Sequence, residues 1–175
     1  MRGHLSEARD FTFTNGTARV REWLADCAAL LHERCPDYPV LYSETNGFDI
    51  NTDRWTVAMA AWTEYIPADA EPYSWGGSDV DLHYEEDLTL AGGEAMQRAF
   101  EWYGQQEHRS DVARNDEALA QWLVWADWLK LLQAAWNEGP VPGVRVPLIA
   151  TAHDFDVFLR LEPHAGGLVG EAADS

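Results

Sequence analysis

Apolar residues recur at helical spacing in three parts of the chain. The stripe over residues 17–34 consists of Val20, Trp23, Leu24, Cys27, Leu30 and Leu31. Pro36 predicts that this helix ends just before it. A second helix is expected from Gly92-Gly93 to about residue 106. A third is expected over about residues 116–137, which precede Gly139 and Pro140, residues typical of a helix end.

Aromatic and β-branched runs between these helices predict strands. Residues 38–50, YPVLYSETNGFDI, contain Asn46-Gly47, which predicts a hairpin with a tight primed turn. Its return strand would contain Phe48 and Ile50. Residues 54–65, RWTVAMAAWTEY, are apolar on both faces of a strand, and this pattern indicates a central strand.

A strand pair is expected near the C-terminus. Residues 144–152, VRVPLIATA, are rich in β-forming residues. Pro147 lies within this run and cannot donate a ladder hydrogen bond, which predicts an edge strand or a bulge. Residues 156–162 can pair back with it across a turn at His153-Asp154.

Within residues 75–88, WGGSDVDLHYEEDL, polar and apolar side chains alternate from Asp79 to Glu85. Val80, Leu82 and Tyr84 would lie on one face, and the opposite face would carry Asp79, Asp81, His83 and Glu85. Such alternation is typical of a half-buried strand with one solvated face. Same-face carboxylates are about 6.6 Å apart and repel one another. A cationic partner would relieve this repulsion.

The order of these elements predicts the fold class. One helix, several strands, two helices and a closing strand pair indicate an α+β domain. We expect a small, mainly antiparallel sheet with about three helices packed on it. A chain of 175 residues can bury its own core, so residues 1–163 are expected to form one domain. The Gly- and Ala-rich residues 164–175 would form a loose tail.

The expected helix over residues 116–137 is unusually rich in tryptophan. A seam at Trp122, Trp125 and Leu129 predicts that these residues contribute most to burial. Too much of the helix circumference is apolar for an ordinary amphipathic helix. We therefore expect a central, mostly buried helix. The alternative is a helix that keeps one apolar face for a partner.

Charge restricts the classes of partner. The chain has 12 Lys and Arg against 30 Asp and Glu, a net charge of −18, and no Lys or Arg lies between residues 55 and 97. Binding to nucleic acid or to an anionic membrane surface needs clustered cations, so neither is expected. A basic protein would instead be attracted.

Several features point to the cytoplasm. No apolar run reaches the length of a membrane span, and the N-terminal residues lack the apolar segment of a signal peptide. Cys27 and Cys35 are eight positions apart on a predicted helix, about 12 Å along its axis. That separation is too long for a disulfide, as expected in a reducing compartment.

Catalytic chemistry is the weaker interpretation. Gly77-Ser78 and the pair Asp79 and Asp81 resemble a nucleotidyltransferase motif over about six residues, but they lack its intervening segment and any nearby cation. His153 could serve with His83 as acid, base or metal ligand, although a turn explains it more simply. The enzymatic alternative is therefore a metal- or acid/base-dependent enzyme that uses Asp79, Asp81, His83 and His153. Otherwise we expect no cofactor and no metal site.

The layout resembles a group of bacterial inhibitors. Residues 17–162 carry an N-terminal helix, a YPVLYSETNG hairpin, an acidic Trp-bearing middle, two helices and a strand pair near IATAHDFD. In this order and composition they resemble the small acidic α+β immunity proteins of polymorphic-toxin systems. The resemblance implies a cytoplasmic inhibitor that blocks a basic toxin. The high Ala and Trp content and the 11 Arg against 1 Lys suggest a bacterial or phage gene.

An inhibitor of a basic effector is therefore the leading hypothesis. Its predicted partner-binding residues are Trp75, Asp79, Asp81, Glu85, Glu86 and Asp87. The related alternative is a DNA mimic that occupies the nucleic-acid site of a restriction or CRISPR protein, as anti-CRISPR proteins do. A mimic should display its acidic residues in rows, whereas an immunity protein should concentrate them in one patch.

Overall fold

A computed structural model describes residues 8–48, 50–62, 82–83, 86–105, 111–152 and 159–164. Its helices are α2 (Thr17–Arg34), α3 (Glu94–Gly104) and α4 (Asp111–Asn137). Its strands are β1 (Val40–Thr45), β2 (Thr56–Trp62), β3 (Leu82–His83), β4 (Leu88–Thr89), β5 (Leu148–Ala152) and β6 (Leu159–Leu161). The predicted α+β fold class is confirmed.

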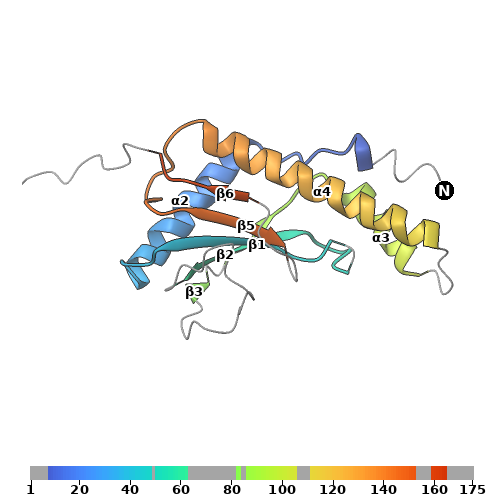
Figure 1. Cartoon of the computed structure of the whole chain (residues 1–175), viewed down its shortest axis with the longest axis horizontal. Helices are drawn as coiled ribbons and strands as arrows, with labels where there is room; N and C mark the ends of the chain where they lie inside the picture. The colour runs from blue at the N-terminus through green and yellow to red at the C-terminus, as the bar shows by residue number, and fades with distance from the viewer. Residues whose placement is uncertain are drawn as a thin grey trace, which may run out of the picture.

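The strands form one mixed sheet in the order β3-β2-β1-β5-β6, and β4 also pairs with β2. Every pair is antiparallel except β1 with β5, which is parallel. Helices α2 and α4 pack together over one face of this sheet (Figure 1). Helix α3 lies beside the first half of α4, to one side of the strands. The mainly antiparallel sheet is as predicted.

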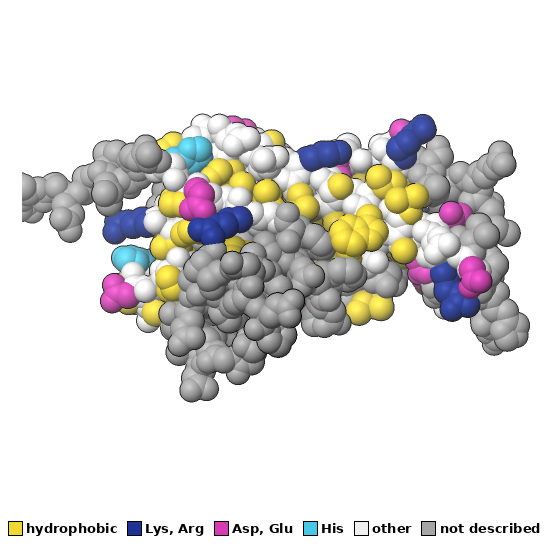
Figure 2. All heavy atoms as spheres, in the orientation of Figure 1, with side chains coloured by type: hydrophobic (Ala, Val, Ile, Leu, Met, Phe, Trp, Pro, Cys, Tyr) yellow, Lys and Arg dark blue, Asp and Glu magenta, His cyan; other side chains and the backbone are white. Residues whose placement is uncertain are grey.

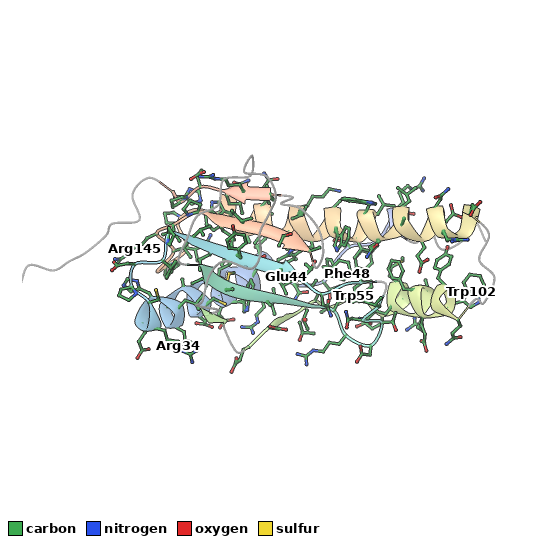
Figure 3. The ribbon with its side chains drawn as sticks, turned by 60° about the horizontal axis from the view of Figure 1, so that its bottom comes forward. Arg34, Glu44, Phe48, Trp55, Trp102 and Arg145 are labelled. Carbon is green, nitrogen blue, oxygen red and sulfur yellow. The ribbon has the colours of Figure 1, made fainter. Side chains whose placement is uncertain are left out.

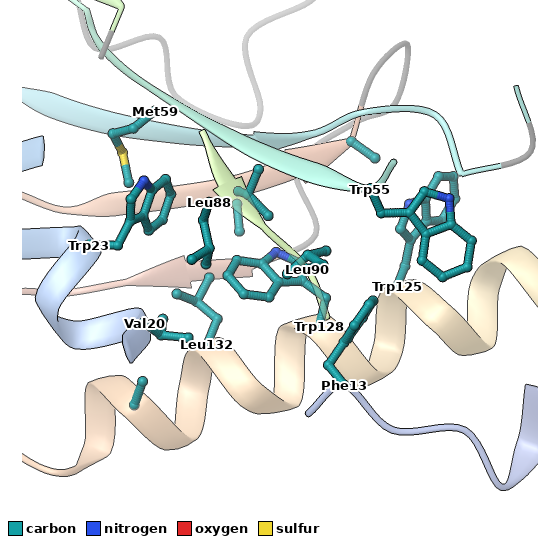
Figure 4. Packing of buried hydrophobic residues seen from close by; sticks show 14 of the residues in the cluster. Phe13, Val20, Trp23, Trp55, Met59, Leu88, Leu90, Trp125, Trp128 and Leu132 are labelled. Carbon is teal, nitrogen blue, oxygen red and sulfur yellow. The ribbon is translucent and has the colours of Figure 1, made fainter. Parts of the chain in front are cut away.

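Helix α2 spans the predicted residues because its sequence carries both a stripe and a stop. Its buried residues are Val20, Trp23, Leu24, Cys27, Ala28 and Leu31. Trp23 from α2 meets Met59 from β2 in the core (Figure 4). Strand β2 pairs on both sides, as predicted, and Val57, Met59 and Ala61 face the helices.

The predicted tight turn at Asn46-Gly47 is wrong. The chain returns only at Thr56, which is joined to Asn46 by a backbone hydrogen bond of 3.1 Å and by a side-chain bond of 3.0 Å. Phe48 turns inward instead and is fully buried, 4.8 Å from the ring of Trp55. The Trp55 indole N–H also donates to the Phe48 carbonyl at 3.1 Å. Burying the Phe48 and Trp55 rings stabilises the longer loop more than a two-residue turn would stabilise a hairpin.

The predicted edge strand at the C-terminus is also wrong. Strand β5 lies between β1 and β6, and Pro147 precedes its first residue. The missing N–H of Pro147 therefore costs no ladder bond, while its carbonyl accepts from Leu41 N–H at 2.9 Å. Pairing of residues 156–162 with this strand is confirmed through Leu159–Leu161. The turn at His153-Asp154 and residues 165–175 of the predicted tail lie outside the described residues.

Helix α4 is central, as predicted, but its rotation differs from the expected seam. Trp125 and Trp128 are buried, and Leu129 is half-buried. Trp122, predicted to be buried, is 47 % exposed. The helix also begins at Asp111, earlier than predicted. Because its sequence is apolar almost all round, packing contacts decide which face is buried. One such contact is the Phe13 N–H, which donates to the Asp127 carboxylate at 2.8 Å.

We expect Arg21→Lys to lower the free energy of unfolding by about 1–3 kcal/mol, measured by chemical denaturation. The Arg21 guanidinium joins α2 to the end of α4 by donating to the carbonyls of Ala135, Gly139 and Pro140 at 2.7, 2.9 and 2.7 Å. A lysine keeps the charge but loses the planar fork. The control Arg19→Lys alters an exposed pair with Glu22 and should cost less than about 0.5 kcal/mol. Equal costs would contradict the bridging role.

Candidate acidic binding site

The structure describes part of the predicted partner-binding stretch. Glu86 and Asp87 are exposed and directly precede β4. The other predicted residues, Trp75, Asp79, Asp81 and Glu85, lie outside the described part of the chain. Their role stays a prediction. The site can therefore be built from Glu86, Asp87 and the strands beside them.

Sheet register places two carboxylates in one row. Leu88 of β4 pairs with Val57, so that the preceding residue, Asp87, falls beside Ala58. On its other side Ala58 pairs with Glu44 of β1. Val57 and Leu88 are buried against the helices, and side chains alternate along a strand. The row of Glu44, Ala58 and Asp87 therefore lies on the face away from the helices.

A pocket of about 490 Å³ opens along this row. Its described lining comprises Glu44, Asn46, Gly47, Ile50, Asn51, Thr56, Ala58 and Asp87. The short side chain of Ala58 leaves space between the two flanking carboxylates. Figure 3 labels Glu44 on β1, near Phe48 and Trp55, whereas Arg34 at the end of α2 and Arg145 lie toward the opposite end of the strands. The described lining residues include two carboxylates and no basic side chain, and we call this site the acidic pocket.

Two asparagines fix the wall of the pocket. Asn46 donates from Nδ2 to the Arg54 carbonyl at 2.8 Å and accepts from Thr56 N–H. Asn51 donates to the Gly47 carbonyl from its backbone N–H at 2.9 Å and from Nδ2 at 3.0 Å. All of these hydrogen bonds join residues within the loop or at its two ends. The wall is therefore held in place before any ligand arrives.

The rim of the pocket combines charge with an exposed apolar side chain. Ile50 is 71 % exposed, more than any other large hydrophobic residue in the described part of the chain. Arg54, the nearest described cation in the sequence, is directed to the Thr89 hydroxyl, with contacts of 3.2 and 2.6 Å. Arg54 is not among the described lining residues, but it is bound beside the pocket, because Thr89 pairs with the lining residue Thr56. The site offers two carboxylates and an apolar contact to a cationic ligand.

The structure describes only one of the four residues named for the enzymatic alternative. His83 belongs to β3, whose backbone pairs with Ala60, whereas Asp79, Asp81 and His153 lie outside the described ranges. Within those ranges no three His, Cys, Asp or Glu residues are grouped to hold a metal ion.

No described helix is long and apolar enough to span a bilayer.

Cys27 is a core thiol, as its place on the helical stripe predicts. It is fully buried, and both cysteines are free. Burial raises the pKa of the Cys27 thiol, and the adjacent Asp26 carboxylate raises it further. A thiol held protonated is a poor nucleophile.

We expect a thiol reagent at about pH 8 to modify Cys35, which is partly exposed, and to spare Cys27 until the protein unfolds. Mass spectrometry of the folded protein should therefore find one modified cysteine. The Cys35→Ser variant should react only in denaturant. Rapid modification of Cys27 in the folded variant would contradict the buried assignment.

Sequence reasoning missed Glu44, Ile50 and Asn51 as site residues. Glu44 lies in a run that reads as an ordinary strand, and only its pairing with Ala58 brings it near Asp87. The sequence pattern assigns Ile50 to a return strand that does not form.

A comparison with protein-family models, curated proteins and solved structures finds no match for this chain.

Proposed function

We propose that the protein is an acidic inhibitor that binds and neutralises a basic protein effector, in the manner of an immunity protein. The observation that carries this proposal is the pocket between Glu44 and Asp87. It lies at the end of the acidic stretch that runs from Asp79 to Asp87 in the sequence. A cationic side chain would fill it and relieve the local repulsion.

The overall charge supports a basic partner. A net charge of −18 raises the local concentration of a cationic protein and speeds its encounter. The same charge opposes contact with nucleic acid and with anionic membranes. The free thiols of Cys27 and Cys35 suit a reducing cytoplasm, where such an effector would be met.

The pocket between Glu44 and Asp87, rather than the spread of acidic residues, favours an inhibitor over a DNA mimic. On the face drawn in Figure 2, the described acidic side chains lie singly among basic ones and form neither rows nor a single patch. Mimicry of a phosphate backbone would be served by rows of carboxylates at regular spacing. A local pocket is better suited to a specific cationic side chain.

The test is stoichiometric inhibition of a purified partner. A tagged copy of the full chain is used to recover a partner, which is then purified and assayed for its own activity. We expect activity to fall linearly with added inhibitor and to vanish near one equivalent. Full activity in the presence of excess inhibitor would contradict the proposal. Inhibition that is lost whenever nucleic acid saturates the partner would favour the DNA mimic instead.

A further inference from the structure

The sequence contains two Asn-Gly pairs, Asn15-Gly16 and Asn46-Gly47, and in both the asparagine side chain is hydrogen-bonded through its oxygen and its nitrogen. We propose that Asn15 and Asn46 are deamidation sites that the fold keeps closed by these paired hydrogen bonds. Each asparagine is modified only when the strand end that holds it opens. This inference is independent of the proposed function.

Deamidation of an asparagine consumes one water and releases ammonia. The backbone nitrogen of the next residue attacks the side-chain carbon Cγ, so that a C–N bond forms and the bond from Cγ to Nδ2 breaks. Nδ2 leaves as ammonia and takes the proton of the attacking amide. Water then opens the five-membered imide at either carbonyl, which yields aspartate or isoaspartate. Glycine favours the attack because no Cβ hinders the approach of its nitrogen.

The Asn46 side chain joins the two ends of the loop between β1 and β2. Its Nδ2 donates to the Arg54 carbonyl at 2.8 Å, and its Oδ1 accepts from the Thr56 N–H at 3.0 Å. The Asn46 backbone N–H also donates to the Thr56 carbonyl at 3.1 Å. The side-chain amide therefore cannot turn its face to the Gly47 nitrogen without losing bonds to the facing strand.

Asn15 is held in the same way, between the N-terminal segment and the end of β4. Its Nδ2 donates to the Thr89 carbonyl at 3.1 Å, and its Oδ1 accepts from the Ala91 N–H at 2.7 Å. The neighbouring Thr14 N–H donates to the Ala91 carbonyl at 2.9 Å. Attack by the Gly16 nitrogen again requires that these bonds break first.

The two sites differ in exposure. Gly16 is exposed and both side-chain bonds of Asn15 lie at the surface, whereas Gly47 is buried and the bond from the Thr56 N–H is partly buried. Segments at the surface open at a lower free energy than those against the core. Asn15 should therefore react before Asn46 in the folded protein.

Modification of Asn46 would also alter the acidic pocket. Asn46 and Gly47 belong to its lining. An aspartate at position 46 can still accept from the Thr56 N–H, but it has no donor for the Arg54 carbonyl. Isoaspartate would in addition lengthen the backbone by one methylene. Deamidation at this site would therefore loosen the wall of the pocket.

Peptide mapping by mass spectrometry tests the proposal. The full chain is incubated in mildly alkaline buffer, folded or in denaturant, and deamidation is followed at each asparagine. In denaturant we expect Asn15 and Asn46 to react well before Asn51, which is followed by a threonine. In the folded protein we expect both to react about tenfold to hundredfold more slowly, because two hydrogen bonds close each site.

Hydrogen exchange shows whether opening controls the reaction. The Ala91 N–H donates to Asn15 and the Thr56 N–H donates to Asn46, so that exchange of each amide reports the opening of one site. We expect the Ala91 amide to exchange faster than the Thr56 amide, in the same order as deamidation.

Gly16→Ala is the matched control. Gly16 has a φ of −78°, and an added Cβ there meets no described atom within 4 Å. The variant should therefore fold as the wild type does. In denaturant it should slow the reaction at Asn15 and leave that at Asn46 unchanged.

Three results would overturn the proposal. The first is deamidation at equal rates in the folded and the denatured protein. The second is reaction of Asn46 ahead of Asn15 in the folded protein, or in an order opposite to the exchange of the two amides. The third is an unchanged rate at Asn15 in denatured Gly16→Ala.

Discussion

Trp55→Ala is expected to lower the free energy of unfolding by about 3–5 kcal/mol, measured by chemical denaturation. Trp55 is fully buried and makes ring contacts with Phe48, Phe13 and Phe100 at 4.8, 6.1 and 5.9 Å. A Cβ atom at Gly93 would lie only 2.6 Å from its ring, so the site is tightly closed. The surrounding side chains could collapse little into the cavity left there, so little of the lost packing energy would be recovered.

Trp122→Ala is the matched control for this substitution. Trp122 is 47 % exposed on α4, and its closest described aromatic neighbour is Trp125, with ring centroids 5.1 Å apart. Its truncation should cost about 1 kcal/mol or less, because much of the side chain is already in water. Similar losses for the two variants would show that α4 is rotated differently in solution.

The paired substitutions Glu86→Lys and Asp87→Lys are expected to lower the rate of association with a basic partner by about tenfold or more at low ionic strength. Both residues are exposed, and Asp87 lines the acidic pocket. Reversing them removes local attraction and places two cations in the path of the partner. Stopped-flow or surface-binding kinetics would measure the change.

Glu33→Lys with Asp37→Lys provides the control for total charge. Both residues are exposed near the end of α2, and the net charge changes by the same amount. If position matters, this variant should associate at close to the wild-type rate. Equal slowing by both pairs would attribute the attraction to net charge alone, and the acidic pocket would lose its special role.

The sequence predicted those elements whose signals are local. Helix α2 has a one-sided stripe and a proline just after it, and it spans the expected residues. Strand β2 was recognised because it is apolar on both faces. The rotation of α4 was not predictable, since its apolar residues surround the helix. The hairpin failed because Phe48 packs against Trp55 and also against Phe13 and Trp125, two residues distant in the sequence.

The site was predictable only in its charge. The cation-free stretch and the carboxylates at Glu86 and Asp87 identify the acidic region directly. The pocket depends on register between β1, β2 and β4, which places Glu44 and Asp87 on the same face on either side of Ala58. Strand β4, only two residues long, gives no sequence signal of its own. Its pairing is decided by Leu88, which is buried in the core.

The central claim is that acidic side chains draw a basic protein to this surface. Its most direct test is the association rate with that protein as ionic strength rises from about 0.01 M to about 1 M, over which the Debye length falls from about 30 to about 3 Å. We predict that the association rate falls by about tenfold or more while the dissociation rate changes far less. An association rate that stays constant across this range would contradict the claim.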